Sequence, residues 1–160
     1  MSQHEAEDAP HSVDYGPVRV FFGKKKGSYP EGNSLWVRGE RECVLMDPAV
    51  GLHARETLPD PVDRILLSHF HEDHVAGLPL FPETPVHLHT LDKPGLEDHD
   101  SMRDFYGYPP DVMETFGEIV ENQFHWFSSS FIEFDDAAAG NLSDFFSCQT
   151  GTCHFDTDFM

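Results

Sequence analysis

The stretch Ser68-His69-Phe70-His71-Glu72-Asp73-His74-Val75-Ala76-Gly77 holds the most informative pattern in this chain, His-x-His-x-Asp-His. Residues two apart in an extended segment face the same way, so His69 and His71 are expected to direct their imidazoles at one point. If the chain turns into a helix near Asp73, then Asp73 and His74 face a second point beside the first. The pattern therefore predicts a metal site.

Imidazole nitrogen and carboxylate oxygen bind zinc at about 2.0–2.2 Å. Two such ions about 3.5–4 Å apart can share a water molecule, lower its pKa and hold a hydroxide nucleophile. The competing interpretation is a solvated histidine-rich loop, because the chain contains 11 histidines. The context favours the metal site, since the motif follows an apolar run and precedes the small-residue step Ala76-Gly77.

Apolar and β-branched runs around the motif predict a set of short strands, and one segment has helical spacing. The expected strands are 18–22, 34–38, 43–46, 64–68 and 86–89, with a hairpin turn at 39–42. A short helix is expected over 52–58. A longer one is expected over 111–122, after a pair of prolines.

The charge of the chain limits its partners. Ten basic residues stand against 29 acidic ones, which gives a net charge of −19. Nucleic acid and anionic membrane surfaces need cations to meet their phosphates, so neither is expected as a partner. Three cysteines are too few for a disulfide scaffold, and no signal peptide or apolar span is evident, so a cytoplasmic location is expected.

Composition divides the chain into three parts. Residues 1–16 are polar and are expected to form a disordered leader. Residues 17–125 contain the predicted strands and the motif at 69–74. Residues 126–160 form an acidic, phenylalanine-rich segment, and the chain from 104 to 160 carries eleven acidic residues and no lysine or arginine. Such a composition is unusual for half of a folded domain, and the segment is expected to be degenerate, truncated or frame-shifted.

The motif resembles the signature of the metallo-β-lactamase-fold hydrolases. The segments 33–37, 44–48 and 86–89 are similar to further strands of that family, so the resemblance covers about residues 17–90. It implies an α/β (α+β) fold, the αββα sandwich of the family, of which this length holds the first half and a connecting region. The fold is therefore expected to be partial or truncated. A degenerate member, or a homodimer that covers the open sheet face, would also account for the length.

The resemblance also implies a role for each motif residue. His69 and His71 would bind a first zinc ion, and Asp73 and His74 a second. Asp73 would also orient the water or receive its proton, as the catalytic residue. Asp47, at the end of a predicted strand, would accept an N–H from a ligand histidine and fix its tautomer. A simple turn residue is the alternative for Asp47.

The three further ligands of the family, a histidine, a bridging aspartate and a late histidine, have no recognisable counterpart here. Cys148 and His154 are the weak candidates to replace one of them, since thiolate and imidazole both bind zinc.

The expected function is zinc-dependent hydrolysis of a small ester, thioester, lactone or related substrate by a metal-activated hydroxide. Family members that reduce oxygen or nitric oxide with di-iron sites typically carry glutamate at the position of His71, so this histidine favours zinc. The alternative is a catalytically inactive or truncated member with an incomplete metal site. A third hypothesis, an acidic enzyme adapted to salt, rests on the net charge alone.

Overall fold

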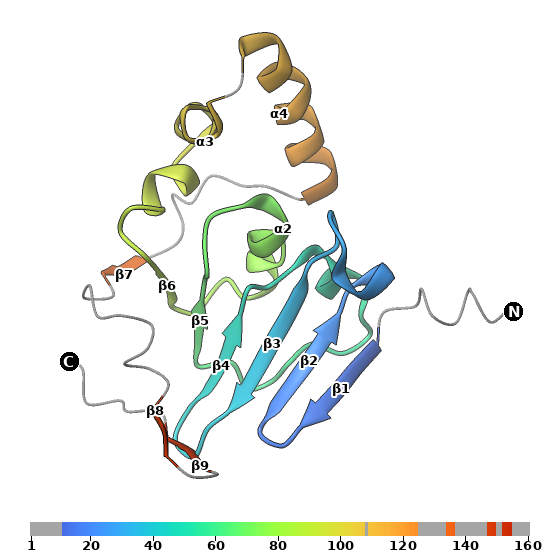
Figure 1. The fold of residues 1–160 in the computed structure, drawn as a ribbon, viewed down its shortest axis with the longest axis vertical. Helices are drawn as coiled ribbons and strands as arrows, with labels where there is room; N and C mark the ends of the chain where they lie inside the picture. Colours follow the sequence, from blue (N-terminus) through green and yellow to red (C-terminus); the bar gives the residue numbers. More distant parts are fainter. Residues whose placement is uncertain (1–10, 108, 125–133, 137–146, 150–151, 155–160) are drawn as a thin grey trace, which may run out of the picture.

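The structure is a computed structural model, and it describes residues 11–107, 109–124, 134–136, 147–149 and 152–154. Its centre is a seven-stranded sheet with the strands in sequence order, β1 to β7 (Figure 1). The strands are β1 His11–Tyr15, β2 Val18–Phe22, β3 Asn33–Arg38, β4 Cys43–Met46, β5 Arg64–Leu66, β6 Val86–Leu88 and β7 Phe134–Asp136. The predicted α/β fold is confirmed.

The first four strands pair antiparallel, and β4 to β7 pair parallel. Parallel strands end at the same edge of a sheet, so the residues that follow β4 and β5 come together there. In register, Leu45 lies beside Ile65 and Met46 beside Leu66. Asp47 follows β4, and its N–H donates to Leu66 O at 3.0 Å. The sheet therefore brings Asp47 to the start of the histidine motif.

The core lies on the sheet face that carries Trp36, Leu45 and Ile65, which are neighbours in register on β3, β4 and β5. Leu45 and Ile65 are fully buried. The Trp36 ring lies under the loop after β4, and its Nε1–H donates to Pro61 O at 3.0 Å. This loop contributes Leu52 to the same core cluster, so the loop covers part of this apolar face of the sheet.

Strand β1 corrects the prediction of a disordered leader for its five residues. The strand is mostly exposed, and the alternation in Ser12-Val13-Asp14-Tyr15 supplies only two apolar side chains, too few to indicate a strand. It pairs along its full length with β2, and Asp14 forms ion pairs with Arg19 at 2.8 Å and Arg38 at 3.0 Å. Residues 1–10 lie outside the described part of the chain.

The helix expected over 52–58 is also wrong. The segment forms only the 3-10 turn η2, Val50–Ala54, which ends at Arg55 with an extended backbone, and the chain bends at 56–57. The Arg55 side chain explains why, because it reaches back to donate to Phe22 O at 2.8 Å and His11 O at 3.0 Å. Tertiary hydrogen bonds thus outweigh a weak local preference for helix.

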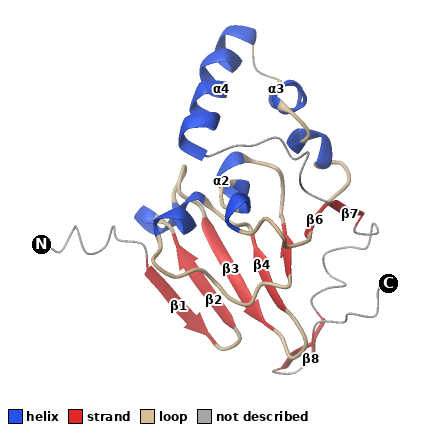
Figure 2. Ribbon diagram, turned by 180° about the vertical axis from the view of Figure 1, so that it is seen from behind, coloured by secondary structure: helices blue, strands red, loops and turns tan. Residues whose placement is uncertain are grey.

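Three helices lie beyond the edge at which the parallel strands end (Figure 1). They are α2 Glu72–Val75, α3 His99–Tyr106 and α4 Pro110–Phe124. Helix α4 confirms the helix predicted over 111–122, whereas α3 was not predicted. Seen from behind, α2 lies between the sheet and the α3–α4 pair (Figure 2). In the described residues, no helix has the length and apolarity needed to cross a membrane.

The acidic C-terminal segment contains β7 and a separate two-stranded sheet, β8 Ser147–Gln149 with β9 Thr152–His154. β7 extends the main sheet by pairing parallel with β6. The expectation that residues 126–160 are degenerate, truncated or frame-shifted stays a prediction.

Candidate metal centre

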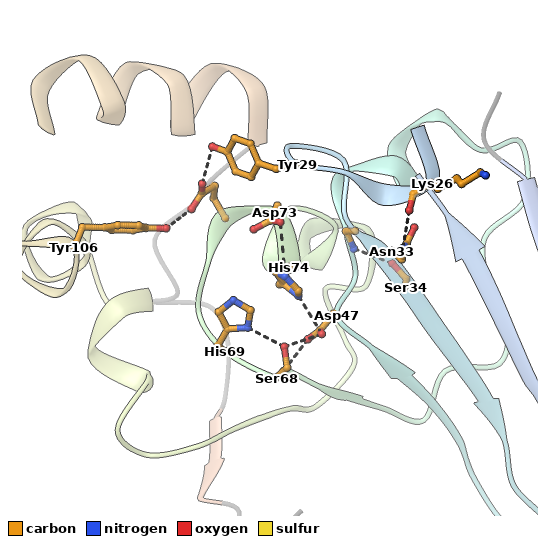
Figure 3. A network of polar contacts seen from close by, with 12 residues as sticks. Lys26, Tyr29, Asn33, Ser34, Asp47, Ser68, His69, Asp73, His74 and Tyr106 are labelled. Carbon is orange, nitrogen blue, oxygen red and sulfur yellow. Dashed lines mark hydrogen bonds and ion pairs between the residues drawn. The ribbon is translucent and has the colours of Figure 1, made fainter. Parts of the chain in front are cut away.

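The motif begins where β5 ends, and Asp47 holds its first residue. Ser68 N–H donates to Asp47 Oδ1 and Ser68 Oγ–H to Asp47 Oδ2, both at 2.7 Å (Figure 3). The Asp47 backbone has a φ of +47°, a left-handed conformation that a residue with a side chain seldom adopts. Strain of this kind persists where surrounding contacts enforce it, and here two strand ends and the Ser68 hydrogen bonds do so.

These contacts also determine which ring nitrogen of His69 carries the proton. The Ser68 hydroxyl proton is donated to Asp47, so its oxygen accepts from His69 Nδ1 at 2.9 Å. A neutral imidazole carries one N–H and one lone pair. The lone pair of His69 therefore lies on Nε2, the nitrogen that remains available to a metal ion.

The helix turn predicted near Asp73 is present. His71 precedes α2 with an extended backbone, and His74 N–H donates to His71 O at 3.0 Å in the first turn. This turn brings the three motif imidazoles together. The His69 ring centroid lies 4.5 Å from that of His71 and 4.2 Å from that of His74.

Two carboxylates flank the His74 ring. Its Nδ1 lies 3.1 Å from Asp47 Oδ2, and its Nε2 lies 3.6 Å from Asp73 Oδ2 (Figure 3). The buried Nδ1 makes no well-aligned hydrogen bond to any described residue, so the contact with Asp47 is an ion-pair distance. Asp47 therefore touches a motif histidine at ion-pair distance, and its expected role of accepting an N–H from a ligand histidine stays a prediction.

The electrostatics of His69 and His74 differ. The contact with Asp47 raises the pKa of His74 above its ordinary value, and this outweighs the opposing effect of burial. Burial lowers the pKa of His69, and the neighbouring His74 and His71 lower it further. At neutral pH His69 is therefore neutral, which is the form that binds metal.

The donor set suits zinc, although the donors do not surround a common point. Three imidazoles and one carboxylate are ligands that zinc accepts, and His69 Nε2 is free of the Ser68 contact. Within the described ranges, no group of three or more His, Cys, Asp or Glu side chains is arranged to hold a metal ion. The residues therefore fit the metal by the chemistry of their donor atoms.

Glycines allow α2 to pack closely on the end of β4. A Cβ on Gly77 would lie 2.8 Å from Pro48 O, and one on Gly32, with a φ of +60°, would lie 2.6 Å from Asp73 O. Gly77 N–H also donates to Pro48 O at 2.7 Å. The small-residue step after the motif is therefore required by packing.

Glu72, inside the motif, is a buried carboxylate, with 3% of its surface exposed. Its carboxylate accepts hydrogen bonds from Tyr29 Oη and Tyr106 Oη. No local pattern links these residues, since Tyr29 lies 43 positions before Glu72 and Tyr106 lies 34 after it. The sequence alone therefore does not indicate this contact.

The weak candidates Cys148 and His154 lie in the β8–β9 pair. In its register, Ser147 is opposite His154 and Cys148 is opposite Cys153. Their side chains are outside the described part of the structure, so their proposed replacement of a missing ligand stays a prediction. A cleft of about 480 Å³ lies elsewhere, lined by Arg19, Trp36 and Arg55 among others, and contains no motif residue.

A family model, described as the metallo-beta-lactamase superfamily, matches residues 30–122, more than half of the chain. No curated protein sequence matches the chain.

Several solved structures align with the chain. The hydrolase AbOPH of the beta-lactamase superfamily does so with a TM-score of 0.44 and 19% identity, over 71% of this chain and 54% of its own. A metallo-beta-lactamase from Pontibacter korlensis has a TM-score of 0.41 and 20% identity, over 52% and 45%. The dizinc quorum-quenching lactonase AidC has a TM-score of 0.43 and 14% identity, over 86% and 65%. The chain spans about half the length of the first two structures.

Proposed function

Because the chain belongs to the metallo-beta-lactamase superfamily, we propose that it is a metal-dependent hydrolase whose metal ligands are His69, His71, Asp73 and His74. The main observation behind the proposal is that the three motif imidazoles lie close together. The ring centroid of His74 is 4.2 Å from that of His69, and the centroid of His71 is 4.5 Å from it. They lie where β4 and β5 end, the edge at which open α/β sheets bind their ligands.

Zinc is the ion we propose, in one or two copies, and when bound it supplies a water of lowered pKa and a Lewis acid. His69 Nε2 is the atom we assign to the ion, because Nδ1 carries the proton donated to Ser68. Asp73 is the proposed catalytic residue, since its Oδ2 lies 3.6 Å from His74 Nε2 and is able to accept a proton from water there. Asp47 holds His74 from the opposite side of the ring.

The substrate class we propose is a small ester, thioester or lactone. The net charge of −19 supports this choice over nucleic acid, whose phosphates such a surface repels. A cytoplasmic location is also part of the proposal and rests on the three cysteines, which are too few for a disulfide scaffold. The homodimer stays a prediction.

The proposal is tested by metal content. Purified protein is stripped with a chelator, loaded with zinc, freed of excess metal by gel filtration and measured by mass spectrometry. The His71→Ala variant removes one proposed ligand. His11→Ala is the matched control, because it removes an exposed histidine on the edge strand β1.

About one to two zinc ions per chain, lost in His71→Ala and kept in His11→Ala, support the proposal. Hydrolysis of small thioesters and lactones by the loaded protein is then measured. Less than about one zinc per chain, unchanged by His71→Ala, contradicts it and favours the alternative, an inactive member with an incomplete metal site. That alternative is supported by one observation: among the described residues, no three or more His, Cys, Asp or Glu side chains are arranged to hold a metal ion.

A further inference from the structure

Glu72 is a buried carboxylate within the metal motif that the proposed chemistry does not use. Only 3% of its surface is exposed. Burying a carboxylate is costly unless hydrogen bonds replace its water. Both oxygens are satisfied: Tyr29 Oη donates to Oε1 at 3.0 Å, and Tyr106 Oη donates to Oε2. The pair of phenols therefore accounts for its burial.

The three residues come from separate parts of the fold. Tyr29 lies in the loop before β3, Glu72 opens α2 and Tyr106 ends α3. In Figure 3, Tyr29 and Tyr106 point toward each other from opposite sides. Through the hydrogen bond with Tyr106, Glu72 therefore links α3 to α2, the short helix that begins within the motif.

Tyr106 in turn contacts a proposed metal ligand. Its ring stacks on the His71 imidazole, with centroids 5.1 Å apart and planes 18° from parallel. Phe70 meets the same imidazole edge-on at 5.0 Å and the Tyr106 ring at 5.7 Å. The Tyr106 ring thus sets the plane of the His71 imidazole that stacks on it. The hydroxyl of Tyr106 is in turn held by its hydrogen bond to Glu72.

We propose that Glu72 and Tyr106 are positioning residues for His71: the hydrogen bond between them holds the phenol ring flat against the imidazole and so orients this ligand for the metal. The inference rests on the proposed function only where it makes His71 a ligand. Partners that orient a metal ligand from behind typically affect metal affinity by about 10–100-fold.

The structure offers a matched pair of variants. Tyr106→Phe removes the hydroxyl that Glu72 holds and leaves an aromatic ring beside His71. Tyr29→Phe removes the corresponding hydroxyl from the other oxygen of the same carboxylate, while its ring lies against Phe124. Both variants lose one hydrogen bond to Glu72, so general loosening of the site affects them alike.

Two readouts are used. The first is zinc affinity, by competition with a chromophoric chelator. Tyr106→Phe is expected to weaken binding by about 10-fold and Tyr29→Phe by less than about 2-fold. Glu72→Gln, which keeps an acceptor oxygen, is expected to retain affinity better than Glu72→Ala. The second is the NMR shift of the His71 ring protons in the metal-free protein, which the stacked Tyr106 ring displaces; Tyr106→Phe is expected to change it and Tyr29→Phe is not.

Equal losses of affinity in the two tyrosine variants, with unchanged His71 signals, overturn the proposal. If the wild-type protein binds no zinc, the proposed function fails, and the His71 signals of the metal-free protein still decide this inference. A change confined to Tyr106→Phe supports it, and no change in that variant overturns it.

Discussion

Replacing Gly77 with alanine tests how tightly the motif helix is seated on the end of β4. The new Cβ would lie 2.8 Å from Pro48 O and 3.0 Å from Ala49 O. Both are backbone atoms in the segment that follows β4, so the clash is relieved only if this part of the backbone moves. Gly77 has a φ of −87°, which alanine also adopts, and the whole cost of the substitution is therefore steric.

Overpacking of this kind typically destabilises a protein by about 1–3 kcal/mol. Urea unfolding of a small domain has a slope of about 1–3 kcal/mol per molar. For a loss of about 2 kcal/mol and a slope of about 2, the urea midpoint falls by about 1 M. The midpoint is measured by circular dichroism on the metal-free protein, so that metal binding does not contribute.

Gly117→Ala is the control, and it is expected to have the opposite sign. A Cβ at Gly117, inside α4, meets nothing within 4 Å. Alanine in a helix is favoured over glycine by about 0.5–1 kcal/mol, so this midpoint rises slightly. The reasoning is refuted if Gly77→Ala leaves the midpoint unchanged or raises it as the control does.

Two further predictions concern titration. Asp47→Asn is expected to lower the pKa of His74 toward its ordinary value near 6.5, because the contact with Asp47 raises it; NMR titration of the metal-free protein measures this, and an unchanged pKa contradicts it. The folded state holds this proton more tightly than the unfolded chain, so stabilisation from His74 is fully present below about pH 6.5 and is lost as the pH rises through the raised pKa. The Cys43 thiol has a raised pKa, from burial and then from the charge of Asp63. It is therefore expected to react with iodoacetamide at pH 8 more slowly in the folded protein than in urea, as followed by peptide mapping, and equal rates would count against this explanation.

Local pattern predicted the elements that carry apolar or β-branched runs in the sequence. The runs at 18–22, 43–46 and 86–89 became β2, β4 and β6 with bounds shifted by one residue at most, and 111–122 became α4. Each strand carries an apolar run or alternation, and α4 has apolar residues at helical spacing. Strand β1 has only two alternating apolar residues and is mostly exposed. The short helix over 52–58 was wrong because Arg55 donates hydrogen bonds to the carbonyls of β1 and β2 instead.

The candidate site divides in the same way. The spacing of His69 and His71 predicted that their imidazoles face one point, with Asp73 and His74 beside it if a helix begins near Asp73. The contact between Asp47 and a ligand histidine was an expectation from the family resemblance. The partners of Glu72 were not predictable, because its two tyrosines lie 43 and 34 positions away and reach it through different elements.

The sequence by itself determined the types of donor, their spacing and the strand that delivers them, because these depend on residues adjacent along the chain. Only the tertiary structure decided which groups hold those donors in place. Asp47 reaches Ser68 across 21 positions because β4 and β5 are parallel and end at one edge of the sheet. Tyr106 reaches Glu72 because the end of α3 lies beside the start of α2, and hydrogen bonds between such distant residues leave no periodic pattern in a sequence.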